Sequence, residues 1–288
     1  MQERQPSRTA RGAALHRALH QRLEGGEIFS DPLAAAILGE EAVSGAETEA
    51  KDPSIRSTRL FFAARSRFAE DALANAIARG VRQAVVLGAG LDTFGLRNPH
   101  AQQGLRVFEV DHPATQAWKQ RRLGQAALIV PPSLTFVPID FECGSLVDAL
   151  VAAGFQTQSP AFFLWLGVVP YLTHETIDAV LGFIAALPDS EVVFDYSEPL
   201  ENYPPARRKG IVAMAEHVTA MGEPWLTHFD PAVLARDLRA LGFTEQEDLG
   251  PQEMAVRFYG VPKDEAPTGA GPRVIRTRQQ PEAATRTP

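Results

Sequence analysis

The hydrophobic positions of the chain follow two spacings, which together predict an α/β fold. Short apolar runs typical of buried strands alternate with segments whose apolar residues recur every three or four positions, as on one face of a helix. The predicted strands lie at 85–87, 105–111, 134–139, 162–166 and 191–196. A helix at 55–78, ended by Gly80, precedes the first of them. This alternation indicates a doubly wound, Rossmann-like sheet of mostly parallel strands.

The segments before and after the start of the first strand differ in their hydrophobic pattern. Residues 1–80 carry helical spacing throughout and predict an N-terminal helical cap. Residues 81–262 form the main α/β domain. Within it, a proline-rich insertion at about 199–228 follows the fifth strand, where loops of such folds cover the ligand site. We therefore expect this insertion to act as a lid.

The end of the chain predicts one more pair of strands and then a tail. Runs at 244–249 and 254–259 predict a C-terminal antiparallel hairpin, which brings the sheet to seven strands. Residues 263–288 are rich in Pro, Thr, Gly and Arg with few apolar residues, so they are expected to be disordered.

Composition and charge narrow the class of protein. The chain has 288 residues, of which 45% are hydrophobic, enough for one large domain with a buried core. Its formal net charge of -7 argues against nucleic acid as a partner, because phosphate binding needs clustered Lys and Arg. With the single cysteine Cys143 there is no internal disulfide, and no targeting segment opens the chain, so we expect a cytoplasmic protein. The longest apolar stretch, 161–172, is shorter than the ~20 residues that span a bilayer, and no membrane partner is expected.

The first strand ends in a glycine turn that indicates a nucleotide-like ligand. Gly88, Ala89 and Gly90 follow the strand directly, and the two glycines leave room for close approach to the backbone. A dinucleotide-binding loop would have a third glycine where this chain has Thr93. Asp92 beside the turn would also repel a phosphate. These features argue against a dinucleotide.

Acidic residues at the ends of the next two strands favour a nucleoside without phosphate. Asp111 lies about where a ribose-binding carboxylate belongs, and Asp140 with the ring of Phe141 suits an adenine. Together with the glycine turn they predict a site for S-adenosylmethionine. The competing interpretation of the glycines is an ordinary turn. Glu109 and Asp92 are weaker candidates that could instead hold a loop or pair with Arg97.

Several motifs together resemble a known family. They are the stretches 62–97, 107–113, 165–172 and 222–225, which read FAARSRF…VVLGAGLDTFGLR, VFEVDHP, WLGVVPYL and GEPW. In this order and spacing they resemble the leucine carboxyl methyltransferase family, most closely its bacterial branch of class I S-adenosylmethionine-dependent methyltransferases. The resemblance covers about residues 8–262.

The resemblance implies roles for three further residues. Arg65 takes the position that grips the cofactor's carboxylate, against the alternative of a surface arginine. Tyr171 takes the position near the transferred methyl group. Family members carry a glutamate facing the methionine end of the cofactor where this chain has Leu166. Backbone carbonyls near Leu166 and Gly167, or an acidic residue elsewhere, could replace it; otherwise the cofactor site is degenerate.

The predicted lid contributes candidate groups for chemistry. His228 is the candidate base and His217 a weaker one, although surface histidines are the more common case. Trp225 could line an acceptor pocket, whereas Trp165 suits the core. The chain lacks the sequence motifs of zinc proteases, serine hydrolases and calcium loops, so no metal is expected.

These observations predict an S-adenosylmethionine-dependent O-methyltransferase. Its partner would be a small molecule with a hydroxyl or carboxyl group as methyl acceptor, and a base is needed only for an alcohol. One alternative is methylation of a protein C-terminal carboxylate, the activity best known in the family. Others are a non-catalytic scaffold that kept the fold and a dehydrogenase. The pattern does not define an oligomeric state.

Overall fold

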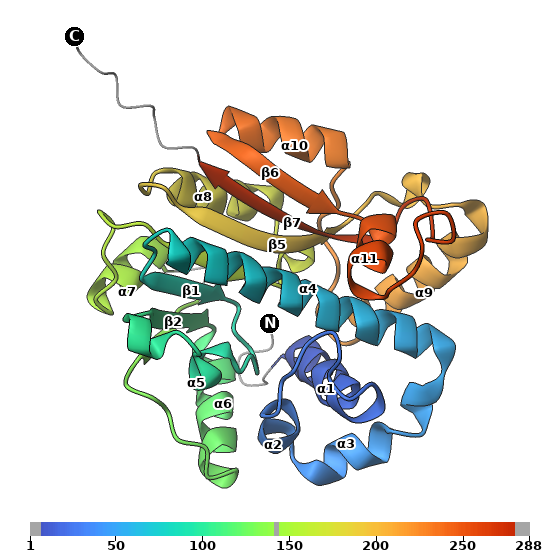
Figure 1. The fold of residues 1–288 in the computed structure, drawn as a ribbon, viewed down its shortest axis with the longest axis horizontal. Coiled ribbons are helices and arrows are strands. Elements are labelled where there is room, and N and C mark those ends of the chain that lie inside the picture. The colour runs from blue at the N-terminus through green and yellow to red at the C-terminus, as the bar shows by residue number, and fades with distance from the viewer. Residues whose placement is uncertain (1–6, 141–143, 280–288) are drawn as a thin grey trace.

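A twisted sheet of seven strands runs through the middle of the molecule (Figure 1). The structure, a computed structural model, describes residues 7–140 and 144–279. The strand order is β3-β2-β1-β4-β5-β7-β6. Strands β1 to β5 are parallel, and β7 pairs antiparallel with both β5 and β6. The strands are β1 (Gln83–Leu87), β2 (Arg106–Asp111), β3 (Leu134–Pro138), β4 (Phe162–Trp165), β5 (Glu191–Ser197), β6 (Phe243–Leu249) and β7 (Pro272–Gln279).

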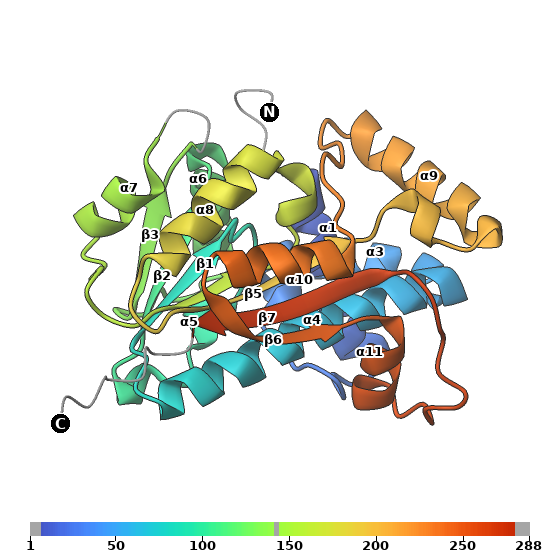
Figure 2. The same cartoon turned by 90° about the horizontal axis from the view of Figure 1, so that it is seen from above.

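Helices cover both faces of this sheet. Figure 2 shows α7, α8 and α10 on one face and α4 with α11 on the other. The helices are α1 (Arg8–Leu23), α2 (Ala34–Leu38), α3 (Glu40–Ala46), α4 (Pro53–Ala78), α5 (Phe94–Arg97), α6 (Pro113–Gln125), α7 (Leu146–Ala152), α8 (His174–Ala185), α9 (Pro205–Ala220), α10 (Pro231–Ala240) and α11 (Pro251–Phe258). Short 3-10 turns are η1 (Glu49–Lys51), η2 (Ala101–Gln103), η3 (Val169–Tyr171) and η4 (Leu200–Asn202). No helix of the described part is both long and apolar enough to cross a membrane.

The central strands are apolar because both of their faces are covered. All residues of β1 and β4 are buried. Alternate residues of β1 point to opposite layers: Val85 packs toward α8 and Val86 toward α4. The strand order reverses between β1 and β4, and the carboxyl ends of parallel strands at such a point form the usual ligand crevice. The prediction of a doubly wound sheet is confirmed.

Helix α4 links the N-terminal helices to the sheet. Asp52 caps it by accepting a hydrogen bond from the Ser54 backbone N–H, and Pro53 occupies its first turn. Its second half packs Phe68 and Leu73 against the sheet, while its first half lies beside α1 (Figure 1). Helix α4, which ends just before the predicted boundary at residue 80, therefore shares a hydrophobic cluster with the strands.

The predicted second strand of the hairpin, 254–259, is wrong, because residues 254–258 belong to α11. At the start of this helix the Glu253 carboxylate accepts a hydrogen bond from the Gly250 N–H at 3.0 Å. Pro251 occupies the first turn of α11, and Met254 and Ala255 are its buried residues. The antiparallel pair at the C-terminal end of the sheet is confirmed, but its second strand is β7.

Strand β7 lies inside the segment predicted to be a disordered tail, so that prediction is wrong for 272–279. Val274 and Ile275 are buried in the two core layers. The arginines before and after these two residues pair with carboxylates of the neighbouring strands, for example Arg276 with Glu191 at 2.5 Å and with Glu245 at 2.7 Å. This arginine-rich segment joins the sheet because charge pairing offsets its low hydrophobicity. Residues 280–288 lie outside the described part.

Candidate functional site

The tips of β1 and β2 meet through Asp111. Its Oδ2 accepts a hydrogen bond from the Gly90 N–H at 2.5 Å, and its Oδ1 accepts one from the His112 N–H at 2.6 Å. Burial raises the pKa of Asp111, although these two backbone hydrogen bonds oppose the rise. The structure thus brings the predicted ribose-binding carboxylate against the predicted glycine turn.

The glycines of this turn also serve the packing of the chain itself. Gly88 and Gly90 have φ angles of +64° and +48°, which favour glycine. A Cβ at Gly88 would lie 2.4 Å from Val168 Cγ2, and one at Gly90 would lie 2.7 Å from the Cβ of Ala10 in α1. Ala89 between them is buried. The turn is therefore enclosed by the loop after β4 and by α1, and a role in cofactor binding stays a prediction.

The tip of β3 joins the same edge of the sheet. The Ile139 N–H donates to the Asp111 backbone carbonyl at 2.9 Å. Asp140 Oδ2 lies 3.8 Å from His112 Nε2. Phe141, the predicted partner of the adenine ring, lies outside the described residues. The three strand tips predicted to converge are therefore neighbours.

Arg65 lies in the core of the molecule and is only 5% exposed. Its Nη1 forms an ion pair with Asp195 of β5, and its guanidinium carbon lies 4.0 Å from the centre of the Phe62 ring. Its Nε is buried without a hydrogen-bond partner among the described residues. The alternative of a surface arginine is excluded in this structure.

Asp195 connects Arg65 to the loop after β4. Its Oδ1 accepts a hydrogen bond from the Gly167 N–H at 2.5 Å. Gly167 has a φ angle of +72°, and a Cβ there would lie 2.9 Å from Arg65 Nη2. Leu166 packs against the apolar layer under α4. The sequence analysis missed Asp195, whose signal is a carboxylate within an otherwise apolar strand.

Tyr171 lies half-buried on η3, directly after this loop. Burial raises the pKa of Tyr171, while a side-chain hydrogen bond with Trp225 and the charge of Arg65 oppose the rise. The hydroxyl therefore stays protonated at neutral pH. Trp225 belongs to the predicted lid, so the structure brings these two predicted residues together.

The segment predicted to act as a lid contacts both helix α1 and the loop after β4. The Thr9 backbone N–H in the first turn of α1 donates to Glu223 at 3.0 Å. A carboxylate at a helix N-terminus is favoured by the helix dipole. Leu226 donates its N–H to the Pro170 carbonyl at 2.7 Å, and the Thr227 hydroxyl donates to the Leu172 carbonyl at 2.5 Å. The lid is thus fastened both to α1 and to the loop that carries Tyr171.

His228, the predicted base, lies at the surface of the molecule. Its side chain is exposed and lines a hollow of about 200 Å³ between α8 and α10, together with His174. The centre of its ring lies 6.5 Å from that of Trp225. The role of His228 as a base stays a prediction.

A histidine that the sequence analysis missed, His16, contacts the same Phe62 ring as Arg65. His16 of α1 stacks on Phe62 with ring centres 4.8 Å apart, and its Nδ1 is buried without a partner among the described residues. Burial, with the charges of Arg65 and Arg59, lowers the pKa of His16 to about 4, so the imidazole is neutral at pH 7. In the sequence it is a lone histidine on the apolar face of a helix, which gives no functional signal.

Buried ion pairs hold the helical cap to the tip of β1. Arg17 of α1 pairs with Asp31 at 2.9 Å and donates to the Leu91 carbonyl at 2.8 Å. Arg97 pairs with Glu70 of α4 at 2.6 Å. Glu109 pairs with Lys119 at 2.5 Å and not with Arg97, so it belongs to the support of the site. These contacts fix α1 above the glycine turn.

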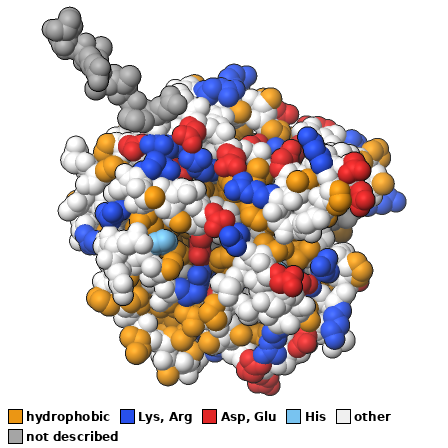
Figure 3. Space-filling model, in the orientation of Figure 1, with side chains coloured by type: hydrophobic (Ala, Val, Ile, Leu, Met, Phe, Trp, Pro, Cys, Tyr) orange, Lys and Arg blue, Asp and Glu red, His pale blue; other side chains and the backbone are white. Residues whose placement is uncertain are grey.

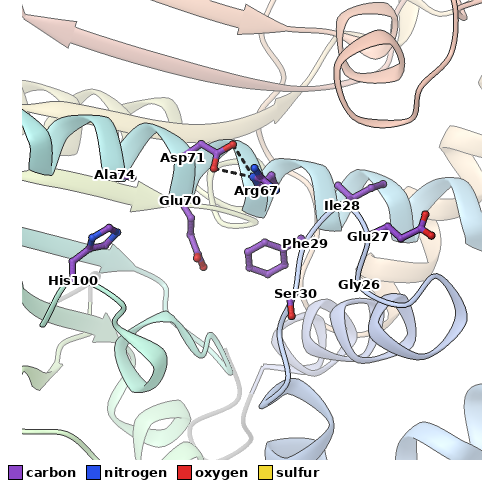
Figure 4. A pocket seen from close by; sticks show the side chains of 10 residues that line it. All are labelled: Gly26, Glu27, Ile28, Phe29, Ser30, Arg67, Glu70, Asp71, Ala74 and His100. Atoms are coloured by element: carbon purple, nitrogen blue, oxygen red, sulfur yellow. Dashed lines mark hydrogen bonds and ion pairs between the residues drawn. The ribbon is translucent and has the colours of Figure 1, made fainter.

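A second hollow, of about 320 Å³, lies on the outer side of α4. Glu70 extends from α4 between His100 and Phe29, and Arg67 pairs with Asp71 along the helix (Figure 4). This hollow is lined by other residues than the strand tips. Figure 3 shows that acidic and basic side chains are interspersed over this face, with no continuous basic area on it.

Comparison with solved structures defines the fold as that of Rossmann-like methyltransferases. A protein of Thermobifida fusca YX, provisionally named a methyltransferase, matches with a TM-score of 0.55 and 18% identity, over 93% of this chain and 94% of that one. A DUF574 family protein of Streptomyces avermitilis matches with a TM-score of 0.52 and 17% identity, over 93% and 97%.

Sequence comparison then defines the family. Residues 10–185 match the profile described as leucine carboxyl methyltransferase, and the chain belongs to this family. YktD of Bacillus subtilis, provisionally named an S-adenosyl-L-methionine-dependent methyltransferase, is 36% identical over 203 residues, which are 70% of this chain and 66% of YktD. A relative in Mycobacterium avium with the same provisional name is 32% identical over 168 residues, 55% of this chain and 53% of its own. The chain thus spans between half and two thirds of the length of these curated relatives.

Proposed function

We propose that the protein transfers a methyl group from S-adenosylmethionine to an oxygen atom of a small molecule carrying a hydroxyl or carboxyl group. Family membership and the names of its relatives support the cofactor and the methyl transfer. Two observations carry the proposal: Asp111 at the end of β2 accepts a hydrogen bond from the glycine turn after β1, and the buried Arg65 has an Nε without a partner among the described residues.

The residues at this edge fit the proposed cofactor. Asp111 offers carboxylate oxygens for ribose hydroxyls, because each oxygen can accept a further hydrogen bond beside the backbone N–H it already binds. Arg65 Nε, buried without a partner among the described residues, would donate to the carboxylate of the methionine end. No phosphate-binding helix start is needed, which agrees with Asp92 beside the turn.

For methyl transfer, the protein mainly has to position the acceptor oxygen relative to the methyl group. When bound, the cofactor supplies a methyl group that its sulfonium makes electrophilic. The chain's own residues would hold the acceptor oxygen in line with it, and such positioning can contribute several kcal/mol. Tyr171, protonated because burial raises its pKa, would donate a hydrogen bond that orients the acceptor. Helix α1 and the lid would exclude water from the reacting atoms.

The closed cover favours a small acceptor over a protein tail. The contact between Thr9 and Glu223 and the hydrogen bonds of Leu226 and Thr227 close the lid across the site. A protein terminus would need this cover to open widely. Methylation of a protein carboxylate is therefore the second candidate among enzymes.

Calorimetry tests the proposal directly. We expect S-adenosylhomocysteine to bind the full chain and NADH to give no heat. Binding of NADH alone would establish a dehydrogenase, and no binding of either would favour a scaffold. Incubation with methyl-labelled cofactor and fractionated cell extract then tests for a small labelled product, since label in protein would favour the second candidate.

A further inference from the structure

In the buried ion pair of Arg65 and Asp195, each side chain has hydrogen-bonding groups that the pair does not use. They match the carboxylate and the ammonium group of an amino acid. We propose that Asp195 binds the α-ammonium group of the cofactor's methionine end while Arg65 binds its carboxylate. The inference rests on the proposed function and adds a ligand-binding residue to it. It also assigns the group that replaces an acidic residue at position 166, where this chain has Leu166.

The contacts of Arg65 leave its carboxylate-binding edge open. Asp195 is bound through Nη1. Nε and Nη2 form the other edge, which matches a carboxylate in bidentate geometry. Nε is buried and has no partner among the described residues, and Gly167 has no side chain to cover Nη2. A buried donor without an acceptor is costly, and the carboxylate of a ligand at this edge would remove that cost.

The carboxylate of Asp195 has room for one more donor. Oδ2 accepts from Arg65 and Oδ1 accepts from the Gly167 N–H at 2.5 Å. A carboxylate offers about four acceptor positions, so about two are left. An ammonium there would meet a negative charge that is only 5% exposed, where an ion pair is screened less than in water.

The position of Asp195 relative to Leu166 supports this role. In the parallel pairing of β4 and β5, Trp165 lies opposite Phe194, so Leu166 and Asp195 follow next on adjacent strands. Leu166 packs into the layer under α4, the same side from which Arg65 reaches Asp195. The negative charge at this edge is therefore supplied by β5 instead of the loop after β4.

Other groups near the loop are weaker candidates. Glu223 is bound to the start of α1, and Asp111 is held at the tip of β2 by two backbone N–H groups. Backbone carbonyls around Gly167 are uncharged and balance a buried ammonium less well than a carboxylate. Asp195 is the carboxylate that touches both Arg65 and this loop.

Four ligands separate the two charges of the methionine end. They are S-adenosylhomocysteine, its analogue without the carboxyl group, its analogue without the amino group, and 5′-methylthioadenosine, which lacks both. For Asp195→Asn we expect affinity for the two amine-bearing ligands to fall about 10- to 100-fold, the range for hydrogen bonds to charged groups. Affinity for the two ligands without an amino group should stay within about twofold. For the one of these that keeps the carboxyl group, affinity could also rise, because the negative charge of Asp195 is removed. Asp178→Asn on the exposed side of α8 is the matched control and should change none of them.

The outcomes separate this inference from the proposed function. If the unaltered protein binds S-adenosylhomocysteine and Asp195→Asn loses all four ligands equally, or none, the inference is overturned and the function stands. If the unaltered protein binds none of the four, the function fails and the inference with it. Circular dichroism and thermal unfolding check that each variant is folded.

A second measurement covers the case in which Asp195→Asn does not fold, since it leaves Arg65 without its buried partner. A crystal structure of the unaltered protein with S-adenosylhomocysteine should show the amino nitrogen within hydrogen-bond distance of an Asp195 oxygen. An amino group bound by backbone carbonyls or by Glu223 instead would overturn the inference.

Discussion

Asp111 combines an observed structural role with the proposed role in ribose binding. Its carboxylate connects the tips of β1 and β2 through the N–H groups of Gly90 and His112. Asp111→Ala removes the proposed ribose acceptor, so affinity for S-adenosylhomocysteine should fall by about 1–3 kcal/mol. Titration calorimetry measures the change. Unchanged affinity in a folded variant would remove the ribose assignment.

His16 should make stability depend on pH. Its pKa is about 4 in the folded protein against an ordinary value of 6.5, so the unfolded chain binds more protons between these values. Its contribution to stability is therefore present above pH 6.5 and is lost as pH falls toward 4. The loss amounts to at most about 3 kcal/mol, from 1.4 kcal/mol per unit of pKa.

The measurement is the free energy of unfolding in urea at several pH values, for the unaltered protein and for His16→Leu. The difference between the two should shrink as pH falls from 6.5 to 4, because only the unaltered protein carries the titrating group. A pH-independent difference would show that His16 is not buried in its neutral form.

At the scale of elements, the turn after β1 depends on glycine for its conformation and for its packing. Gly88 combines a φ angle of +64° with a Cβ position only 2.4 Å from Val168 Cγ2. Gly88→Ala should therefore lower the free energy of unfolding by at least about 1–3 kcal/mol. Chemical denaturation measures this loss.

Gly182 in α8 is the matched control for that substitution. It lies within a helix, and a Cβ there meets no described heavy atom within 4 Å. Gly182→Ala should raise stability by about 0.5–1 kcal/mol, because alanine loses less backbone entropy on folding. Equal effects at the two positions would argue against a strained turn after β1.

The elements that cover the site are held by polar contacts more than by apolar burial. In α9 of the lid only Val218 is buried. Arg17 and Arg97 anchor the cap through buried charges, and Thr9 meets Glu223 across the gap between cap and lid. Because this cover buries little apolar surface, the free energy needed to open it is lower than the free energy needed to unfold the sheet. Access of an acceptor through this cover is thus compatible with a stable core.

At the scale of the whole molecule, β7 closes the fold. It pairs with β5 over residues 191–197 and separates β5 from β6. A chain truncated after residue 262 should lose cooperative thermal unfolding, because two strands would be left without their common neighbour. A chain that ends at residue 279 keeps the seven described strands and is the control. Cooperative melting of the shorter chain would contradict the role assigned to β7.

The strands that could be predicted from the sequence are those whose hydrophobic pattern is set locally. Runs such as Val85–Leu87 are apolar because parallel strands are covered on both faces, so the pattern is visible without knowing the neighbours. The hydrophobic pattern did not predict β7, because Arg273, Arg276 and Arg278 look like a polar tail until their partners outside the strand are known. It failed for α11 because a short apolar run fits a helix and a strand equally well.

The same distinction holds for the site. Gly90 and Asp111 could be predicted because the tips of parallel strands meet at one edge of a sheet by the rules of the fold. Asp195 could not, because it meets Arg65 only where β5 passes under α4, 130 positions further along the chain. His16 depends in the same way on how α1 lies against Phe62.

The amino-acid sequence by itself determined the alternation of strands and helices, the family, and the residues at the tips of the first strands. Buried strands and glycine turns can be identified from short stretches of sequence. The tertiary structure decided which carboxylate stands beside Arg65, where the last strand enters the sheet and how the cap meets the lid. These are contacts between charged groups far apart in the chain, and their free energy depends on burial and geometry that a local pattern does not contain.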